Sequence, residues 1–192
     1  FNNLGSMFAD RHCFLPVNNR WAAVLFRRAA SRGHALGMAN YANHLLHGSG
    51  VRRSFSGAWH YYEKAAEQGE TNGTCGLGFM CVEGLGVEKD PARAYQFFLE
   101  AAENGDTWAM RRVASCLRSG QGVVRQVPAA MAWLQRAADA GDVMAIHELA
   151  GMYEHADFDE LDLARAARLY RIAANMNNTA SMRALGILYA SN

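Results

Sequence analysis

One glycine recurs along this chain at a fixed interval of 36 residues, and this period constrains the fold more than any other feature. The residues are Gly33, Gly69, Gly105 and Gly141, and Asn177 takes the next position. An alanine pair precedes each of them, from Ala29-Ala30 to Ala173-Ala174. A fixed period of this length is typical of a stacked repeat array. The sequence therefore predicts an all-α solenoid of stacked antiparallel helix hairpins.

Each repeat contains two helices, and the first of them, helix A, is best seen after Asp106. This aspartate is placed to cap the helix. The apolar residues that follow have the i, i+3, i+4, i+7 spacing of a half-buried helix. They are Met110, Val113, Ala114 and Leu117, and the same columns recur in every repeat down to Met182, Leu185, Gly186 and Tyr189.

A Gly-x-Gly-Val turn follows helix A in three repeats, at residues 48–51, 84–87 and 120–123. Glycine supplies the positive φ that a sharp reversal needs. Helix B comes next, and Asp90-Pro91 marks its start as an N-cap followed by a proline at the first helical position. The recurring glycine is expected to end helix B in the left-handed conformation. Such a hairpin buries its apolar faces only by stacking on its neighbours.

These motifs resemble the Sel1-like repeat family, the α-solenoid relatives of tetratricopeptide repeat proteins. The resemblance rests on the A-x-x-x-L-G-x-x-Y pattern of helix A, the Gly-x-Gly-Val turn, and the A-x-x-W/Y/F-F/Y/L-x-x-A-A-x-x-G pattern of helix B. It covers nearly the whole chain. It implies a right-handed α-solenoid whose A helices line the concave face, with the B helices outside.

The period predicts a single solenoid domain over residues 1–192 with about nine helices, four A–B pairs and a closing helix A. The expected repeats are a first partial one at 1–33, full ones at 34–69, 70–105, 106–141 and 142–177, and the start of another at 178–192. Neither end reads as a polar cap. We therefore expect the chain to be part of a longer solenoid, with further repeats of its own chain as neighbours.

Composition argues against several classes of protein. The chain has 19 basic and 18 acidic residues, and a formal charge of +1 provides no broad positive surface for nucleic acid. No apolar run approaches the about 18 residues that a membrane-spanning helix needs. No nucleophile, phosphate-loop or zinc motif is present. The sequence predicts a non-enzymatic protein without a cofactor or metal, and it leaves the cellular compartment open.

Two pairs of residues invite a chemical role but have a simpler interpretation. His44 and His47 are three residues apart on a helix, yet no third ligand follows, so we expect surface histidines near a helix end. His12-Cys13 lies in a connector between repeats and carries no further signal.

The fourth repeat and the cysteines also have structural interpretations. An acidic loop from Glu154 to Asp162 replaces the glycine turn, but it lacks the glycine and the ligand spacing of an EF-hand. A solvated loop in which Asp162 caps helix B is expected instead. The cysteines are expected to be buried thiols, although Cys81 and Cys116 occupy adjacent columns of neighbouring repeats, and a bridge between them stays open.

Opposite its buried columns, helix A carries a second stripe that helical geometry leaves exposed. The resemblance places this stripe in a concave groove. Its aromatic, arginine and asparagine side chains are of the kinds that protein interfaces use, and its adjacent arginines suit an acidic segment or a terminal carboxylate. The candidate binding residues are Leu36, Asn40, Asn43, Asn72, Phe79, Trp108, Arg111, Arg112, Met144 and Glu148.

We expect a scaffold or adaptor that holds a protein or peptide segment in this groove. The resemblance implies assembly roles, such as those in bacterial envelope complexes or eukaryotic protein quality control. One alternative is a structural segment of a larger complex. Another is a helical-repeat RNA-binding protein, which requires a basic stripe with base-reading pairs in every repeat. The stripe here is near neutral and has no repeated pairs.

Overall fold

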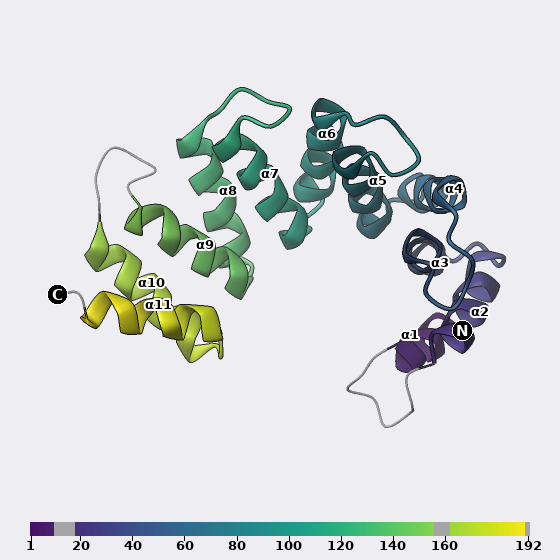
Figure 1. The fold of residues 1–192 in the computed structure, drawn as a ribbon, viewed down its shortest axis with the longest axis horizontal. Helices are drawn as coiled ribbons and strands as arrows, with labels where there is room; N and C mark the ends of the chain where they lie inside the picture. The colour runs from purple at the N-terminus through teal and green to yellow at the C-terminus, as the bar shows by residue number, and fades with distance from the viewer. Residues whose placement is uncertain (10–17, 156–161, 191–192) are drawn as a thin grey trace. The chain divides into compact units, whose positions relative to one another are not determined.

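The computed structural model describes residues 1–9, 18–155 and 162–190, and these residues form eleven α-helices and no strand (Figure 1). A and B helices alternate along the chain. The sequence-based count of about nine helices is two too low, because it left out the hairpin of the first partial repeat. The all-α repeat architecture itself is confirmed.

The described residues fall into two compact units, and the N-terminal unit is Phe1–Asn104. Each of its helices packs against the next, and the A helices α3 and α5 also contact each other. Its A helices are α1 (Asn2–Ala9), α3 (Ala35–His47) and α5 (Thr71–Glu83), and its B helices are α2 (Asn19–Ala30), α4 (Phe55–Ala66) and α6 (Pro91–Glu103).

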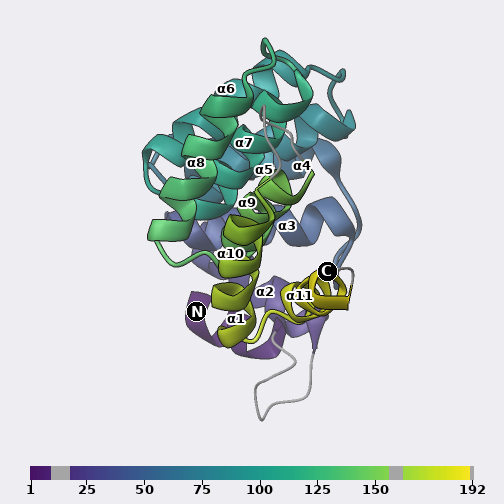
Figure 2. The ribbon, with the colours of Figure 1, turned by 90° about the vertical axis from the view of Figure 1, so that its left-hand side faces the viewer.

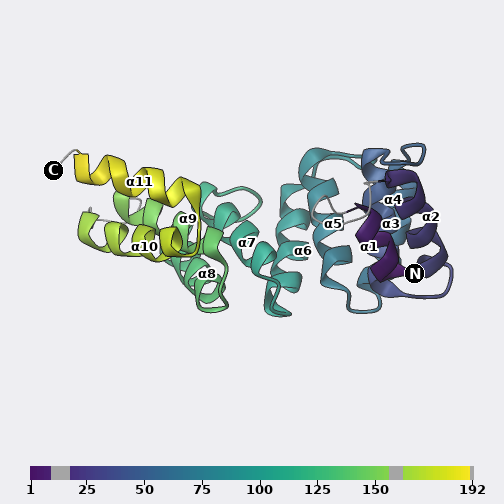
Figure 3. The same ribbon diagram turned by 90° about the horizontal axis from the view of Figure 1, so that it is seen from below.

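The C-terminal unit is Gly105–Asn192. Its consecutive helices also pack pairwise, as Figure 2 shows for α7 and α8 and Figure 3 for α10 and α11. The A helices are α7 (Thr107–Ser119), α9 (Val143–Glu154) and α11 (Thr179–Ala190), and the B helices are α8 (Val127–Asp139) and α10 (Leu163–Asn175).

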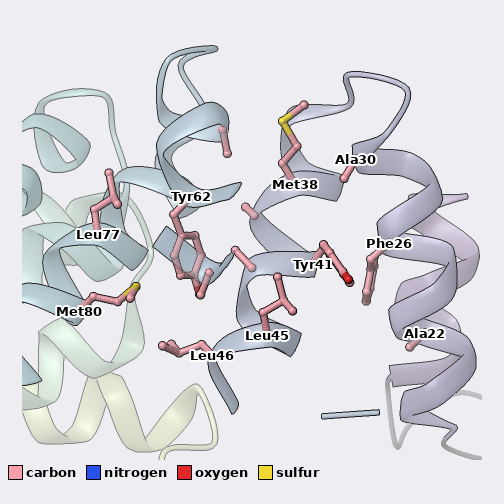
Figure 4. Close-up of a cluster of buried hydrophobic side chains, with 14 residues drawn as sticks. Ala22, Phe26, Ala30, Met38, Tyr41, Leu45, Leu46, Tyr62, Leu77 and Met80 are labelled. Atoms are coloured by element: carbon pink, nitrogen blue, oxygen red, sulfur yellow. The ribbon is translucent and has the colours of Figure 1, made fainter. Parts of the chain in front are cut away.

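The core of the N-terminal unit is built from the apolar columns of consecutive helices (Figure 4). Tyr41 and Leu45 of α3 lie between Phe26 of α2 and Tyr62 of α4. The same columns are buried in α5, α7 and, except for the half-buried Tyr153, in α9. In α11 they are not: Met182 is 45% exposed and Tyr189 is 65% exposed. Leu185 of the same stripe is half-buried against the core beside α10, so the stripe of α11 is only partly covered.

The predicted helix ends are confirmed. Asp90, Asp106 and Asp162 each accept a hydrogen bond from the backbone N–H three residues on, which caps α6, α7 and α10. The recurring glycines have φ between +78° and +91°, and Asn177, at +65°, is the one non-glycine residue with positive φ among the described residues. Asparagine tolerates this conformation better than most residues, which explains the substitution in the glycine column.

The second glycine of the turn has a role that its φ does not reveal. A Cβ atom at Gly50 would overlap the backbone of Asn19 and Arg20 at the start of α2, and one at Gly86 would lie 2.6 Å from the Cβ of Phe55 at the start of α4. The turns after α3 and α5 therefore pack directly on the starts of α2 and α4, the B helices before them. A side chain at either glycine would separate the two repeats.

Candidate partner-binding sites on the A helices

A polar pocket of about 380 Å³ lies between α1, α2 and α3 in the N-terminal unit. Two of the predicted binding residues, Asn40 and Asn43, line it from α3. The full lining is Ser6, Ala9, Asn19, Phe26, Asn40, Asn43, His44 and Ser49. The described lining residues carry amides, hydroxyls and one imidazole, and none of them is a carboxylate, lysine or arginine. Such groups both donate and accept hydrogen bonds, so they suit an uncharged polar ligand such as a peptide backbone.

Hydrogen bonds hold two of these side chains in place. The Asn40 Nδ2 donates to the Oδ1 of Asn2 at 2.9 Å, which joins α3 to α1. His44 Nδ1 donates to the backbone oxygen of Ser49 at 2.6 Å. The exposed Asn43 has no described partner and keeps its amide available to a ligand.

The sequence predicted that His44 lies on the surface, and this prediction was wrong. The residue is buried, and its ring centre lies 5.2 Å from that of Phe26. Because the imidazole closes the turn after α3 by bonding to Ser49, it has a structural use that needs no metal or substrate. His47 is exposed, as predicted.

The other predicted residues of the N-terminal unit do not join this pocket. Leu36 is half-buried at the first turn of α3. Asn72 is exposed and donates through Nδ2 to the carboxylate of Glu70, the N-cap of α5, at 2.8 Å. Phe79 is half-buried against the apolar core. The three residues therefore lie on the A helices without forming one site.

In the C-terminal unit, Trp108 and Arg112 form an aromatic and cationic pair on α7. Trp108 is 38% exposed, and the guanidinium carbon of Arg112 lies 5.5 Å from its ring centre. The two residues are one helical turn apart, so they share a face. On α9, Met144 is 44% exposed and its sulfur accepts a hydrogen bond from Asn178 at 3.4 Å. These side chains offer apolar surface beside a positive charge.

Arg111, the neighbour of Arg112, is held within the protein. Its Nε lies 3.0 Å from Asp142 and its Nη1 lies 2.8 Å from Glu148. Burial lowers the pKa of Arg111, but the hydrogen bond to Glu148 and the charge of Asp142 outweigh this effect and raise the pKa above its usual value. Arg111 thus joins α7 to Asp142 and Glu148 within the unit, so its charge is already paired with acidic groups of the protein.

Several pocket residues were missed at the sequence level. Ser6 lies within α1, Asn19 begins α2, and Ser49 lies in the turn after α3. Asn19 and Ser49 do not belong to the repeated stripe. The link between Arg111 and Glu148 had a usable signal: the two residues are 37 positions apart, or one repeat plus one residue. A search of the sequence for oppositely charged residues at that separation would have predicted the ion pair.

The remaining features of the described residues have structural explanations. Cys81 and Cys116 are buried free thiols, and burial raises the pKa of both. Glu154 accepts a hydrogen bond from the Tyr170 hydroxyl at 2.6 Å. The pair His12-Cys13 and residues 156–161 of the acidic loop lie outside the described residues. Within the described ranges, no three His, Cys, Asp or Glu residues are grouped as metal ligands, and no helix is long and apolar enough to cross a membrane.

A family model described as Sel1 repeat matches residues 2–34, 35–70, 72–106, 109–142 and 143–178. Among solved structures, a Sel1 repeat protein from Oxalobacter formigenes matches with a TM-score of 0.85 at 28% identity, over 98% of this chain and 77% of that one. The protein c5321, a protective antigen of uropathogenic Escherichia coli with an SLR fold, matches with a TM-score of 0.76 at 28% identity. That match covers 98% of this chain and 40% of c5321.

A further match is the immunity protein Pa5087 from Pseudomonas aeruginosa, with a TM-score of 0.67 at 21% identity over 90% of this chain and 63% of that one. At this identity the likeness shows the fold alone. No curated protein matches the sequence.

Proposed function

Because the chain belongs to the Sel1 repeat family, whose members are typically non-catalytic protein-interaction scaffolds, we propose that it is a non-enzymatic scaffold that binds an extended protein segment along its A helices. The family supports the general role. The binding surface and the extended form of the ligand are inferred from the side chains on the A helices.

The observation that carries this proposal is the uncharged polar pocket between α1 and α3. An extended segment presents backbone N–H and C=O groups in alternation, and an asparagine amide can donate to one and accept from the other. Asn43 is exposed at this pocket, while Asn40 is already oriented by Asn2. The pocket therefore supports recognition of main-chain groups rather than of a particular charged side chain.

The pair Trp108 and Arg112 provides a second place for a protein segment, in the C-terminal unit. Tryptophan and arginine contribute a large share of the binding energy in protein interfaces, because they combine a large contact area with hydrogen-bonding or charged groups. Trp108 exposes about two fifths of its surface, with a guanidinium beside the ring. We assign this pair to side-chain contacts with the same class of ligand.

The test is to select binding peptides from a random display library on the whole chain and measure their affinities for variants. Asn43→Ala removes hydrogen bonds worth about 1 kcal/mol each and is expected to weaken binding about fivefold to tenfold. The double variant Trp108→Ala/Arg112→Ala is expected to weaken binding at least tenfold for peptides that reach α7.

Gln96→Ala is the matched control, because Gln96 is exposed on the B helix α6. Its affinity should equal that of the wild type. Selected peptides that bind both A-helix variants with unchanged affinity would place the binding surface elsewhere. Loss of binding by the Gln96 variant would lead to the same conclusion.

A further inference from the structure

The near-neutral charge of the chain hides a strong asymmetry. Residues 1–54 contain seven arginines, no lysine and one acidic residue, Asp10, which makes their formal charge +6. Residues 55–192 contain twelve basic and seventeen acidic residues, which makes theirs −5. Charge asymmetry of this kind affects which partners a surface attracts, although the net charge of +1 gives no sign of it.

Helix α2 collects most of the positive charge on one face. Its buried side holds Ala22, Phe26 and Ala29. At 100° per residue, the exposed side chains from Arg20 to Arg28 occupy a continuous arc of about 120° opposite these residues. We name this surface the α2 face, and it consists of Arg20, Trp21, Val24, Arg27 and Arg28 of α2 together with the exposed Arg32 in the turn just after the helix. Trp21 is 58% exposed and Val24 is 40% exposed, so large apolar side chains stand among the arginines.

In two other B helices the same columns carry fewer charges of one sign. Counting one repeat from α2, the positions of Arg27, Arg28 and Arg32 are taken in α4 by Glu63, Lys64 and Gln68, all exposed. In α8 they are taken by Gln135, Arg136 and Ala140, also exposed. In α10 the exposed Arg171, Ile172 and Met176 again combine arginine with apolar side chains. What distinguishes the α2 face is three arginines in these three columns, which the solenoid does not require.

The turn after α3 extends this positive surface. Gly50 packs on the backbone of Asn19 and Arg20, so the turn lies against the start of α2. Arg52 and Arg53 follow in the same turn and are exposed. No described carboxylate forms an ion pair with these arginines. The guanidinium carbons of Arg28 and Arg32 lie 4.8 and 4.4 Å from the ring centre of Phe1, and that of Arg53 lies 5.2 Å from the ring centre of Phe55. Among the described residues, the positive charges of the surface are thus not neutralised by an acidic group.

We propose that the α2 face binds an acidic helical segment of another protein that carries an apolar side chain between its carboxylates. With a rise of about 1.5 Å per residue, Arg20 and Arg27 lie about 10 Å apart along the helix, with Trp21 and Val24 between them. The complementary pattern is acidic, apolar, acidic. Arginine binds carboxylates through two parallel hydrogen bonds, which favours this partner.

The apolar component favours a protein over the other anionic surfaces. The α2 face presents two large apolar side chains, which is little compared with the apolar face that helices lying in a membrane bury. Duplex nucleic acid offers phosphates, but its backbone provides no apolar surface for Trp21 and Val24. A helix with carboxylates on both sides of a leucine or similar residue satisfies both parts of the face. This surface is separate from the A-helix pocket of the proposed function.

The test uses a synthetic helical peptide of about 16 residues, long enough to span α2, with glutamates on both sides of a central leucine pair. A second peptide has glutamine in place of every glutamate. Binding to the whole chain is measured by fluorescence anisotropy at low and high salt. We expect the glutamate peptide to bind at least tenfold more tightly than the glutamine peptide, and the difference to shrink as salt screens the charges.

Two variants should weaken the glutamate peptide about tenfold each: Arg27→Gln/Arg28→Gln and Trp21→Ala. The control is Arg168→Gln/Arg171→Gln, which removes two exposed arginines from the B helix α10 in the columns of Val24 and Arg27. This control should bind like the wild type. Each altered side chain is exposed, so we expect all three variants to keep their helices. Far-UV circular dichroism checks this.

Three outcomes would overturn the proposal. The first is equal binding of the two peptides, or an equal loss in the α10 control. The second is tighter binding, dependent on Arg27 and Arg28, to vesicles of phosphatidylcholine with phosphatidylserine or to a duplex DNA, which would assign the face to lipid or nucleic acid. The third is self-association lost in Arg27→Gln/Arg28→Gln, which would assign it to a second copy of the chain.

Discussion

The N-terminal unit and the C-terminal unit share one repeat, yet their helices are held together by different interactions. In the N-terminal unit, glycines of α5 lie against aromatic rings: Gly76 faces Tyr62 and Gly78 faces Phe98. Successive A helices are joined there by an uncharged polar link, Asn40 to Asn2, whereas in the C-terminal unit charged and imidazole side chains join them. Arg111 pairs with Asp142 and Glu148, and His147 Nδ1 lies 2.9 Å from the Ser181 hydroxyl.

This difference separates what the repeat determines from what it leaves open. The apolar stripe and the helix stops determine where each helix lies. The positions between neighbouring helices then accept either close apolar packing or a polar link, provided that buried polar groups find partners. The proposed binding surfaces differ in a similar way: the described lining of the pocket beside α3 is uncharged, whereas α7 presents a tryptophan and an arginine.

The largest expected effect comes from adding one methyl group to the same column in each unit. Gly78→Ala would place a Cβ atom 2.6 Å from the ring of Phe98, which is fully buried, so we expect a loss of about 1–3 kcal/mol in the free energy of unfolding. Gly186→Ala meets no atom within 4 Å and should gain up to about 1 kcal/mol from helix propensity. Urea denaturation followed by circular dichroism measures both. Effects of the same sign would show that the two units do not differ at this column.

The next effect concerns the polar link of the C-terminal unit. Arg111→Met keeps the side-chain volume but leaves Asp142 and Glu148 close together without their counter-charge. Arg111 is about one fifth exposed, so we expect a loss of about 1–2 kcal/mol, between the values for surface and buried pairs. The exposed Arg171, changed to Met, is the control and should stay within about 0.5 kcal/mol. If Arg111→Met and the control are equally stable, the ion pairs do not hold α7 and α9 together.

The smallest effect at neutral pH comes from the two buried tyrosines, one in each unit. Burial raises the pKa of Tyr62, and burial together with the hydrogen bond to Glu154 raises that of Tyr170. Both folded-state pKa values therefore exceed the value in the unfolded chain. The stability that the two protonated tyrosines contribute is fully present below about pH 10, the ordinary tyrosine pKa. It is lost as pH rises above this value, because these tyrosine hydroxyls lose their protons in the unfolded chain before they do so in the folded one.

Replacing either tyrosine with phenylalanine should flatten this alkaline loss. Tyr170→Phe should also lower stability by about 1 kcal/mol at pH 7, since its hydroxyl bonds to Glu154, and no such bond is described for Tyr62. Denaturation midpoints between pH 7 and pH 11 measure both effects. A wild-type curve that stays level above pH 10 would contradict the shifts.

Most of the fold was predictable because it depends on local chemistry repeated many times. The caps at Asp90, Asp106 and Asp162 and the left-handed stop at Asn177 follow from the residues themselves. The pocket was less predictable, since it depends on how Ser6, Asn19 and Ser49 meet across three elements. The burial of His44 was missed because its position on the helix did not show that Phe26 would lie beside it.

The contact at the second turn glycine has a consequence for how such arrays diverge. Gly50 contacts backbone atoms of Asn19 and Arg20, and Gly86 contacts the Cβ and backbone of Phe55. Apart from glycine, every amino acid has those atoms, so the coupling between adjacent repeats is insensitive to which residue begins the preceding B helix. A duplicated repeat can therefore dock on its parent at once and later change its side chains. An arginine-rich α2 and an α4 with Glu63 and Lys64 in the same columns can then coexist in one chain.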